Sequence, residues 1–420
     1  MLETYYKDKR TLANFRRGPL GPHFDGFADY FTKKGYAPSS VPAMLKRCYH
    51  FNAFLMDQGI SDVRSINRSL AELFLVVYLL RIKGVGVYKK KVETTTKYFL
   101  NHFFIYLIET GVLHPEVSKQ VVTPYSQLME PYLKYLREEH RVTEAWIQRI
   151  RKRLVPFLEG LGDQARPEAI KSLRAEDIEK YIKKLTADRR RDLRCFVGVL
   201  RGFLRFCVRQ GYMVMDLSGM APSVPSYRLS SLPRGMDDSM LKRVLHSVPL
   251  ETPSGLRDYA ILLIMMTYGI RGKQAAELLL GDIHWERSTI RIRALKGGKD
   301  VELPLLESVG EAILSYLRHR RKSPLREVFL LNRAPFRPLT WRTVEHMVQR
   351  YLIKAGVKIP RSGASTFRHS WAIRALAHGN SMKAIADVLG HRRLDNTFIY
   401  AKADLKTLRQ VAMPWVEVAS

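Results

Sequence analysis

The spacing of apolar residues predicts a mainly helical protein, because apolar side chains recur every three or four positions in most segments. The segment 188–210 is the clearest case. At about 100° per residue, its apolar residues fall on one face of a helix and most of its arginines lie on or beside the opposite face. We predict that the apolar face is buried in a helical domain, and it consists of Leu193, Phe196, Val197, Leu200, Phe203, Leu204 and Cys207.

Two uninterrupted apolar runs, 73–80 and 259–266, are the longest in the chain at eight residues each. A helix that crosses a bilayer needs roughly 18 to 20 such residues. The runs therefore predict no membrane-spanning helix and no membrane partner, and both are interpreted as buried helix segments.

Clusters of proline and serine mark the ends of domains. The clearest linker is 216–236, which contains Pro222, Pro225 and Pro233 and has no helical period. A weaker break lies near 112–126. The chain is accordingly divided into a helical domain 1–115, a second helical domain 122–215, the linker 216–236 and a third domain 237–420.

Two short strands interrupt the helical pattern in the third domain. TIRIRAL (289–295) and DVELPL (300–305) alternate apolar and polar residues, and two glycines lie between Lys296 and Lys299, which predicts a tight hairpin. Asp237 and Asp238 are predicted to cap the helix that opens this domain. The fold class is therefore mainly α with a small antiparallel β-sheet, in which helical domains precede a mixed α/β domain.

The charge balance points to a polyanionic partner. The chain has 70 Lys and Arg against 40 Asp and Glu, which gives 70 − 40 = +30. An excess of this size favours nucleic acid over a membrane surface. The N-terminal residues show no apolar signal region, and the three cysteines are too scattered for a disulfide framework or a zinc site. We expect a cytoplasmic protein associated with the nucleoid.

The second domain holds the basic residues predicted to contact DNA. The stretch between 189 and 210 contains many arginines but a single aspartate. This charge balance is too one-sided for a helix that is merely solvated. Gly198 and Gly202 lie on the same face and are expected to let a sugar-phosphate strand approach closely. The predicted phosphate contacts are Arg149, Lys152, Arg153, Arg190, Arg191, Arg194, Arg201 and Arg205.

Residues suited to phosphoryl transfer are dispersed through the third domain. Arg271 follows an apolar helix, Arg368 begins another, His391 follows a glycine that ends a third, and Tyr400 lies nine residues further on. Guanidinium groups match the oxygens of a phosphodiester, a tyrosine can attack phosphorus, and a lysine can protonate the leaving oxygen. Because the set includes no carboxylate pair, no metal-ligand cluster and no nucleotide-binding loop, no metal and no cofactor are predicted.

At these residues the sequence resembles the tyrosine recombinase (phage integrase) family. TYGIRGKQAAELLLGDI (267–283) matches the box of the first catalytic arginine, LKGGKDVELPL (295–305) the lysine hairpin, and LGH (389–391) the third box. The resemblance covers the third domain and, more loosely, the second, which then corresponds to a SAM-like core DNA-binding domain. It implies that the catalytic residues are Arg271, Lys296 as general acid, Ser365, Arg368, His391 and Tyr400 as nucleophile, with Lys299 as a DNA contact.

Two positions depart from the family pattern. Gln274 stands where members usually carry Glu, so the buried contact at that position is expected to differ. Ser365 stands at the histidine of the His-x-x-Arg box, and a serine offers neither positive charge nor a proton relay near neutral pH. We expect either slower catalysis or a contribution from His369 or from a partner subunit.

The resemblance implies a site-specific DNA recombinase or integrase of a mobile genetic element. Such an enzyme breaks and rejoins double-stranded DNA through a 3′-phosphotyrosine, without metal or ATP, in a homo-tetramer or a mixed tetramer with sister recombinases. Domain 1–115 is interpreted as a second DNA-binding module, either arm-binding or a duplicate of the core-binding domain, or as a protein–protein arm. The segment 405–416 is a candidate helix that packs on a neighbouring subunit or in cis.

Two other functions stay open. One is an architectural DNA-binding protein whose catalytic site is weakened, as Ser365 would suggest. The other is a topoisomerase of the related tyrosine type, which would use much the same residues.

Overall fold

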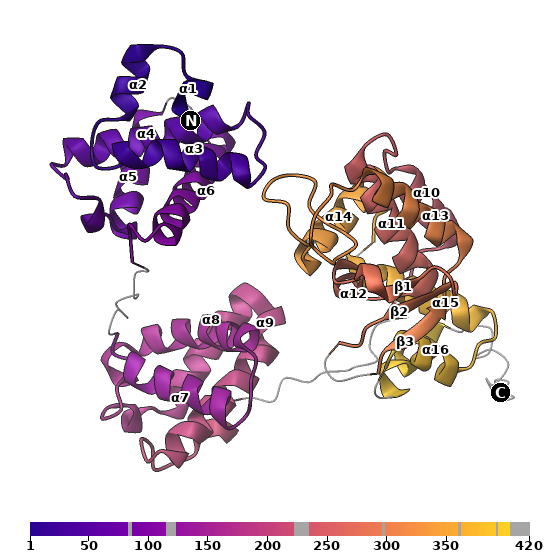
Figure 1. Cartoon of the computed structure of the whole chain (residues 1–420). Coiled ribbons are helices and arrows are strands. Elements are labelled where there is room, and N and C mark those ends of the chain that lie inside the picture. Colours follow the sequence, from indigo (N-terminus) through magenta and orange to yellow (C-terminus); the bar gives the residue numbers. More distant parts are fainter. Residues whose placement is uncertain are drawn as a thin grey trace, which may run out of the picture. The chain divides into compact units, whose positions relative to one another are not determined.

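The computed structural model describes residues 1–82, 86–114, 123–221, 235–295, 299–359, 363–391 and 394–403. It is mostly helical with a small antiparallel sheet, which confirms the predicted fold class (Figure 1). Within these ranges, none of the helices combines the length and the apolar character that crossing a bilayer demands.

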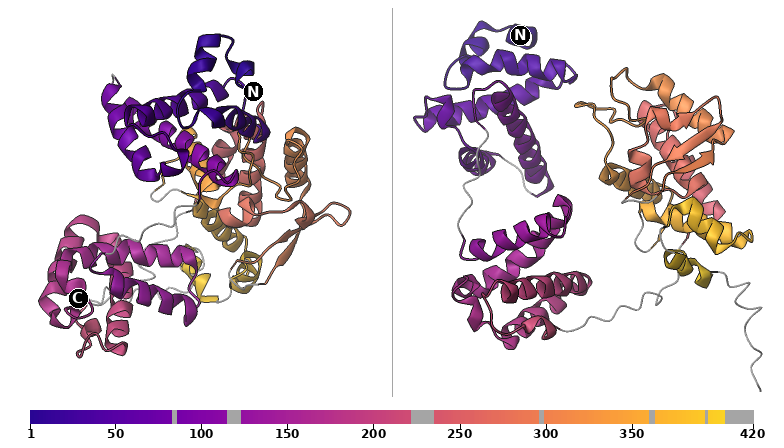
Figure 2. Two further views of the ribbon diagram at one scale, coloured as in Figure 1. Left: turned by 60° about the vertical axis from the view of Figure 1, so that its left-hand side comes forward. Right: turned by 60° about the horizontal axis from the view of Figure 1, so that its bottom comes forward.

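The first 114 residues form a helical part with an aromatic core, drawn from indigo to purple in Figures 1 and 2. Phe27 is fully buried, and its ring centroid lies 4.3 Å from those of Phe31 and Phe103. Aromatic side chains thus supply much of the buried area that holds these helices together. The elements are α1 (Leu2–Tyr5), α2 (Lys9–Phe15), η1 (Gly21–His23), α3 (Phe24–Lys33), α4 (Val41–Asp57), η2 (Val63–Ser65), α5 (Arg68–Arg81) and α6 (Val87–Glu109).

The interpretation of 73–80 as a buried segment is wrong for three of its residues. Leu73, Val76 and Leu80 of α5 are 49%, 59% and 77% exposed. Phe74 and Leu75 lie between them in sequence and are buried. The helix therefore packs by one narrow face, and an apolar run of eight residues does not reveal which of its members faces solvent.

The second helical part, drawn in magenta, has its own core. The described residues of this part, 123–221, cluster as one compact unit. Its described elements are α7 (Ser126–Glu138), α8 (Glu144–Leu161), η3 (Gly162–Ala165), η4 (Ile170–Ser172), α9 (Ala175–Arg209) and η5 (Leu217–Gly219).

Helix α9 confirms the predicted apolar face but is longer than the predicted segment 188–210. All seven residues of that face are buried. The helix begins at Ala175, where the Asp177 carboxylate accepts the backbone N–H of Arg174 at 3.0 Å. The prediction missed this start because the apolar period is weaker between 175 and 187, where charged residues dominate.

Part of the predicted linker packs onto α9. Leu217 and Ala221 are buried in the core of the second part. Arg201 donates to the carbonyl oxygen of Ala221 at 2.7 Å, and Arg205 Nε lies 3.2 Å from Ser218 Oγ. The residues 216–221 therefore extend the second helical part, and 222–234 lie outside the described residues.

The third part, drawn from orange to yellow, carries the sheet. Its described strands pair antiparallel in the order β1-β2-β3, with Ile290 opposite Leu303 and Ile292 opposite Val301. The predicted hairpin is confirmed in β2 and β3, while its tip, 296–298, lies outside the described residues. The elements are α10 (Asp238–His246), α11 (Pro253–Tyr268), α12 (Gly272–Ala276), η6 (Leu280–Asp282), β1 (Ile283–His284), β2 (Thr289–Ile292), β3 (Val301–Pro304), α13 (Glu307–His319), α14 (Trp341–Lys354), α15 (Ala364–Ala377), α16 (Met382–Leu389), η7 (Leu394–Asn396) and η8 (Phe398–Ala403).

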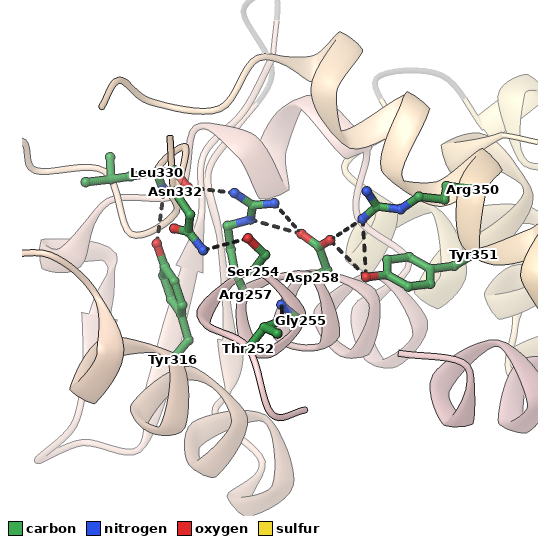
Figure 3. Close-up of polar contacts among 10 residues, drawn as sticks. All are labelled: Thr252, Ser254, Gly255, Arg257, Asp258, Tyr316, Leu330, Asn332, Arg350 and Tyr351. Atoms are coloured by element: carbon green, nitrogen blue, oxygen red, sulfur yellow. Dashed lines mark hydrogen bonds and ion pairs between the residues drawn. The ribbon is translucent and has the colours of Figure 1, made fainter. Parts of the chain in front are cut away.

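Helix α11 lies at the centre of the third part and confirms that 259–266 is largely buried. A buried carboxylate fixes its first half (Figure 3). Asp258 is fully buried and accepts from Arg257 Nη2 at 2.6 Å, from Arg350 Nη2 at 2.7 Å and from the Tyr351 hydroxyl at 3.1 Å. A buried charge is tolerated when it is paired and hydrogen-bonded in this way. The network joins α11 to α14.

Candidate active site

The first predicted catalytic arginine lies at the junction of α11 and α12. Gly269 ends α11 in the left-handed conformation with φ +62°, and a Cβ at this position would lie 2.9 Å from the Trp371 ring. A glycine is therefore required both by the backbone and by the close approach of α15. Arg271 follows as the N-terminal flanking residue of α12, and its side chain is half-buried. Burial lowers its pKa, and the nearby Tyr400 acts in the opposite direction.

The second predicted arginine, Arg368, ties three elements together. It is buried on α15 and donates to the carbonyl oxygen of Gly269 at 3.0 Å and to that of Leu389 at 2.7 Å. These carbonyls are the last groups of α11 and α16, so the guanidinium satisfies two helix ends. Burial, and then the charge of Arg271, lowers the pKa of Arg368 to about 10, so it stays positive at neutral pH.

The predicted nucleophile, Tyr400, lies on η8, which packs against α15. Its side chain is 2% exposed. Burial raises the pKa of its hydroxyl, while Arg368 and Arg271 pull the pKa down. The hydroxyl is therefore protonated at neutral pH, and positive charge lies next to it.

His391 follows the left-handed Gly390 that ends α16. Its Nδ1 lies 2.8 Å from the buried Thr397 Oγ1. Burial, then the charges of Arg368 and Arg271, lowers the pKa of His391 to about 4, so the ring is neutral at pH 7. Sequence reasoning did not identify Thr397, because a threonine six residues from a histidine carries no signal until the chain turns back at η7.

A second histidine contacts the predicted nucleophile. His369 Nδ1 lies 3.1 Å from the Tyr400 hydroxyl, and the two ring centroids are 5.6 Å apart. Ser365, at the position where the family box has histidine, is exposed in the first turn of α15. The structure therefore brings together Arg271, Arg368, His391 and Tyr400 and adds His369, while Ser365 points to solvent.

The hairpin adjoins the two arginines. A small cavity is lined by Arg271, Arg368, Gln274 and the exposed Lys299. Gln274 differs from the family's usual glutamate, and its amide bridges two segments. Its oxygen accepts the backbone N–H of Arg271 at 3.0 Å, and its nitrogen donates to the carbonyl oxygen of Arg293 at 2.8 Å. Lys296 lies outside the described residues.

The residues predicted to contact DNA differ in their placement. Arg149, Lys152, Arg194 and Arg205 are exposed, and Arg153 is half-buried. Arg201 and Arg205 hold the 216–221 segment through the hydrogen bonds given above. The side chains of Arg190 and Arg191 lie outside the described part of the chain.

The predicted role of Gly202 is replaced by a packing role. A Cβ at Gly202 would lie 2.8 Å from the Tyr132 hydroxyl, so this glycine allows α7 to approach α9. A Cβ at Gly198 meets nothing within 4 Å. Of the two glycines, Gly198 is the one that leaves the exposed face of α9 open.

Comparison with known proteins matches the third part to a family model. Residues 236–406 fit the phage integrase family. The "Putative integrase/recombinase y4rA" of Sinorhizobium fredii (strain NBRC 101917 / NGR234) is 31% identical over 411 residues, which cover 96% of each chain. "Tyrosine recombinase XerA" of Thermococcus onnurineus (strain NA1) is 29% identical over 254 residues, covering 60% of this chain and 83% of its own.

Two solved structures share the fold. A lambda integrase dimer bound to a core site gives a TM-score of 0.53 at 14% identity, with 70% of this chain and 98% of that chain covered. The Tn1549 transposon integrase in complex with a circular intermediate DNA gives 0.52 at 16% identity, with 67% and 99% covered. With a near full-length relative above 30% identity, the chain belongs to the phage integrase family and is a site-specific tyrosine recombinase.

Proposed function

We propose that this recombinase is the integrase of a mobile genetic element and that it cleaves double-stranded DNA through a 3′-phosphotyrosine at Tyr400. The observation that carries this proposal is that Arg271 and Arg368 lie beside both Tyr400 and His391. Each arginine acts on the pKa of Tyr400, and both act on the pKa of His391. Residues separated by 129 positions (400 − 271) in the sequence thus share one electrostatic environment.

The geometry suits attack on a phosphodiester. Arg271 and Arg368 present positive charge where a scissile phosphate would accumulate negative charge in the transition state. The Tyr400 oxygen bonds to phosphorus, the bond from phosphorus to the 5′ oxygen breaks, and that oxygen leaves as a 5′-hydroxyl. By family resemblance Lys296 supplies the proton to the leaving oxygen. The neutral His391 ring is fixed by Thr397 and offers a hydrogen bond to a phosphate oxygen.

The charge distribution supports DNA as the partner. The net charge of +30 is far larger than a catalytic site needs, and exposed cations follow α8 and α9. The lambda and Tn1549 integrases, which share the fold, were both solved on DNA. We infer that α8 and α9 track the phosphates of the recombination site, while domain 1–115 contacts flanking DNA or a neighbouring protomer.

The stoichiometry of strand exchange supports a tetramer. Exchange between two duplexes cuts four strands, and each protomer supplies a single Tyr400. Four protomers are therefore needed on two duplexes, either as four copies of this chain or together with sister recombinases.

The test is a covalent complex on DNA. Purified protein is incubated with a suicide substrate nicked beside the cleavage site and taken from the ends of its own element. A protein–DNA band that resists SDS is expected, and Tyr400→Phe is expected to abolish it. An intact control duplex measures binding separately.

The same experiment separates the two alternatives. Because Ser365 is exposed and His369, not Ser365, contacts the Tyr400 hydroxyl, an architectural role has a structural argument, and it predicts bound DNA without a covalent band. A topoisomerase predicts relaxation of supercoiled plasmids that lack the element's ends. Adducts confined to those ends favour the site-specific integrase.

A further inference from the structure

The side chain of His369 contacts the atom that the proposed reaction uses. His369 lies on α15, and its Nδ1 is 3.1 Å from the Tyr400 hydroxyl on η8. The imidazole is half-buried and the tyrosine is buried, so the contact is shielded from bulk water. The ring planes are inclined by 58°, which lets the nitrogen face the hydroxyl edge-on rather than stack on the phenol.

The other candidates for a proton acceptor are less suited. His391 uses its Nδ1 for Thr397, and a hydroxyl such as that of Ser365 does not accept a proton near neutral pH. Ser365 and His369 are four residues apart on one helix, which separates them by only about 40° around its axis. The imidazole missing from position 365 is therefore present one turn further along the same face of α15.

The environment keeps His369 able to accept a proton. Burial, and then the charge of Arg368, lowers the pKa of His369, so the ring is neutral at pH 7. Tyr400 needs such a group, because burial raises the pKa of its hydroxyl and little phenolate exists at this pH. With the proton on Nε2, Nδ1 accepts a hydrogen bond from the hydroxyl.

We propose that His369 is the general base that activates Tyr400. The proposal rests on the proposed function of Tyr400 as nucleophile. As the phenolic oxygen bonds to phosphorus, its proton moves to Nδ1 of His369, and the 5′ oxygen leaves with its electron pair and takes a proton from the general acid. In the reverse step the 5′-hydroxyl returns its proton to the deprotonated general acid as its oxygen bonds to phosphorus. The bond from phosphorus to the tyrosine oxygen breaks, and the His369 imidazolium gives its proton back to that oxygen.

The test uses the full-length chain and single-turnover cleavage of two suicide substrates. One has the natural 5′ oxygen, and the other has sulfur in its place, which leaves without protonation. His369→Ala is expected to slow cleavage of both substrates by about 100-fold at pH 7. The sulfur-containing substrate restores the cleavage rate of a variant that lacks the general acid. Lys296→Ala is therefore the opposite control, because its rate is expected to recover on this substrate. Free imidazole is expected to restore part of the rate of His369→Ala in proportion to its concentration.

Two further variants separate chemistry from structure. His369→Asn keeps a polar atom near the Tyr400 hydroxyl but cannot take its proton, and it is expected to be as slow as His369→Ala. His378→Ala removes an exposed histidine from the end of the same helix and is expected to cleave at the normal rate. DNA affinity and thermal unfolding are measured for every variant, and His369→Asn remains informative if His369→Ala unfolds.

The outcomes of the two proposals are distinguishable. A wild-type chain that forms no adduct, or a Tyr400→Phe variant that still forms one, overturns the proposed function. If the wild type forms the Tyr400 adduct and the cleavage rate of His369→Asn is within about threefold of the wild-type rate, only the base role of His369 is overturned. If the sulfur-containing substrate restored the cleavage rate of His369→Ala, His369 would act by protonating the leaving oxygen. That result would also overturn the proposal.

Discussion

Gln274 Nε2 donates to the carbonyl oxygen of Arg293 at 2.8 Å, so helix α12 is bonded to the hairpin just past the end of β2. The same amide accepts the backbone N–H of Arg271. A glutamate could make the second bond but not the first, because a carboxylate has no proton to donate. The glutamine therefore links the position of Arg271, the first predicted catalytic arginine, to the strand that leads toward Lys296.

Substituting Gln274→Glu is expected to loosen the hairpin. A carboxylate would face the Arg293 carbonyl without a proton between them, while the bond to Arg271 N–H is kept. We expect cleavage of the suicide substrate to slow by about tenfold, equivalent to about 1.4 kcal/mol, with little change in thermal unfolding. Gln274→Ala removes both bonds and is the control. Equal cleavage rates for wild type and Gln274→Glu would show that the bond to Arg293 is dispensable.

The sequence predicted the elements of the site better than their contacts. Gly269, Gly390 and the alternating strands carry local signals for a helix end or a hairpin, and all were found in the expected places. The contact of His369 with Tyr400 depends on η8 folding back onto α15, which no local pattern encodes. For the same reason the sequence did not reveal the buried Thr397.

Burial was predicted well where the period is strong and poorly where it is not. In α9 one face is apolar and the other basic, so the period identifies the buried side. In α5 the run 73–80 is apolar around most of its circumference, and only tertiary packing selects Phe74 and Leu75 over Val76 and Leu80. Gly202 likewise needed the position of Tyr132 to reveal its role.

Asp258 is expected to be critical for the stability of the third part. Asp258→Ala would leave the buried Arg257 guanidinium without its carboxylate (Figure 3), which is expected to lower the free energy of unfolding by about 3 to 5 kcal/mol. Arg350→Ala removes a partner whose side chain is 61% exposed, and a decrease of about 1 kcal/mol or less is expected. Urea unfolding followed by tryptophan fluorescence compares the two. Similar decreases for both variants would show that the buried pair of Asp258 and Arg257 contributes no more than the exposed partner Arg350.

The two glycines of α9 form a matched pair. Gly202→Ala places a methyl group 2.8 Å from the hydroxyl of Tyr132, whose ring is buried and cannot easily move, and stability is expected to fall by about 1 to 3 kcal/mol. Gly198→Ala meets open space, and the better helix former is expected to add about 0.5 to 1 kcal/mol. Urea unfolding measures both. If instead Gly198→Ala were destabilising, the open face of α9 would be in doubt.

Exposed cations on α8 are expected to set the salt dependence of DNA binding. Removing one cation from a phosphate lowers the slope of log affinity against log salt by about 0.9. Arg149→Ala with Lys152→Ala is therefore expected to reduce the slope by about 2. Arg209→Ala is the control, because Arg209 pairs with Glu139 at 3.3 Å and donates to the Tyr135 hydroxyl at 3.0 Å. Titrations on one duplex at several salt concentrations give the slopes, and an unchanged slope in the double variant would exclude these two residues from the interface.

The pH dependence of cleavage is expected to report the pair of His369 and Tyr400. The groups beside them are Arg368 and Arg271, which stay protonated, and His391, whose pKa of about 4 leaves it neutral, so none of these three changes charge between about pH 6 and 8.5. The sulfur-containing substrate removes the contribution of the general acid.

In the wild type, the base is neutral above the lowered pKa of His369, so the cleavage rate is expected to be nearly constant from about pH 7 to 8.5. In His369→Ala the rate follows the fraction of phenolate, and because the pKa of Tyr400 is raised, that fraction grows about tenfold for each pH unit over this range. The variant should therefore approach the wild-type rate as the pH rises. A constant ratio between the two rates at every pH would mean that His369 positions the tyrosine without taking its proton.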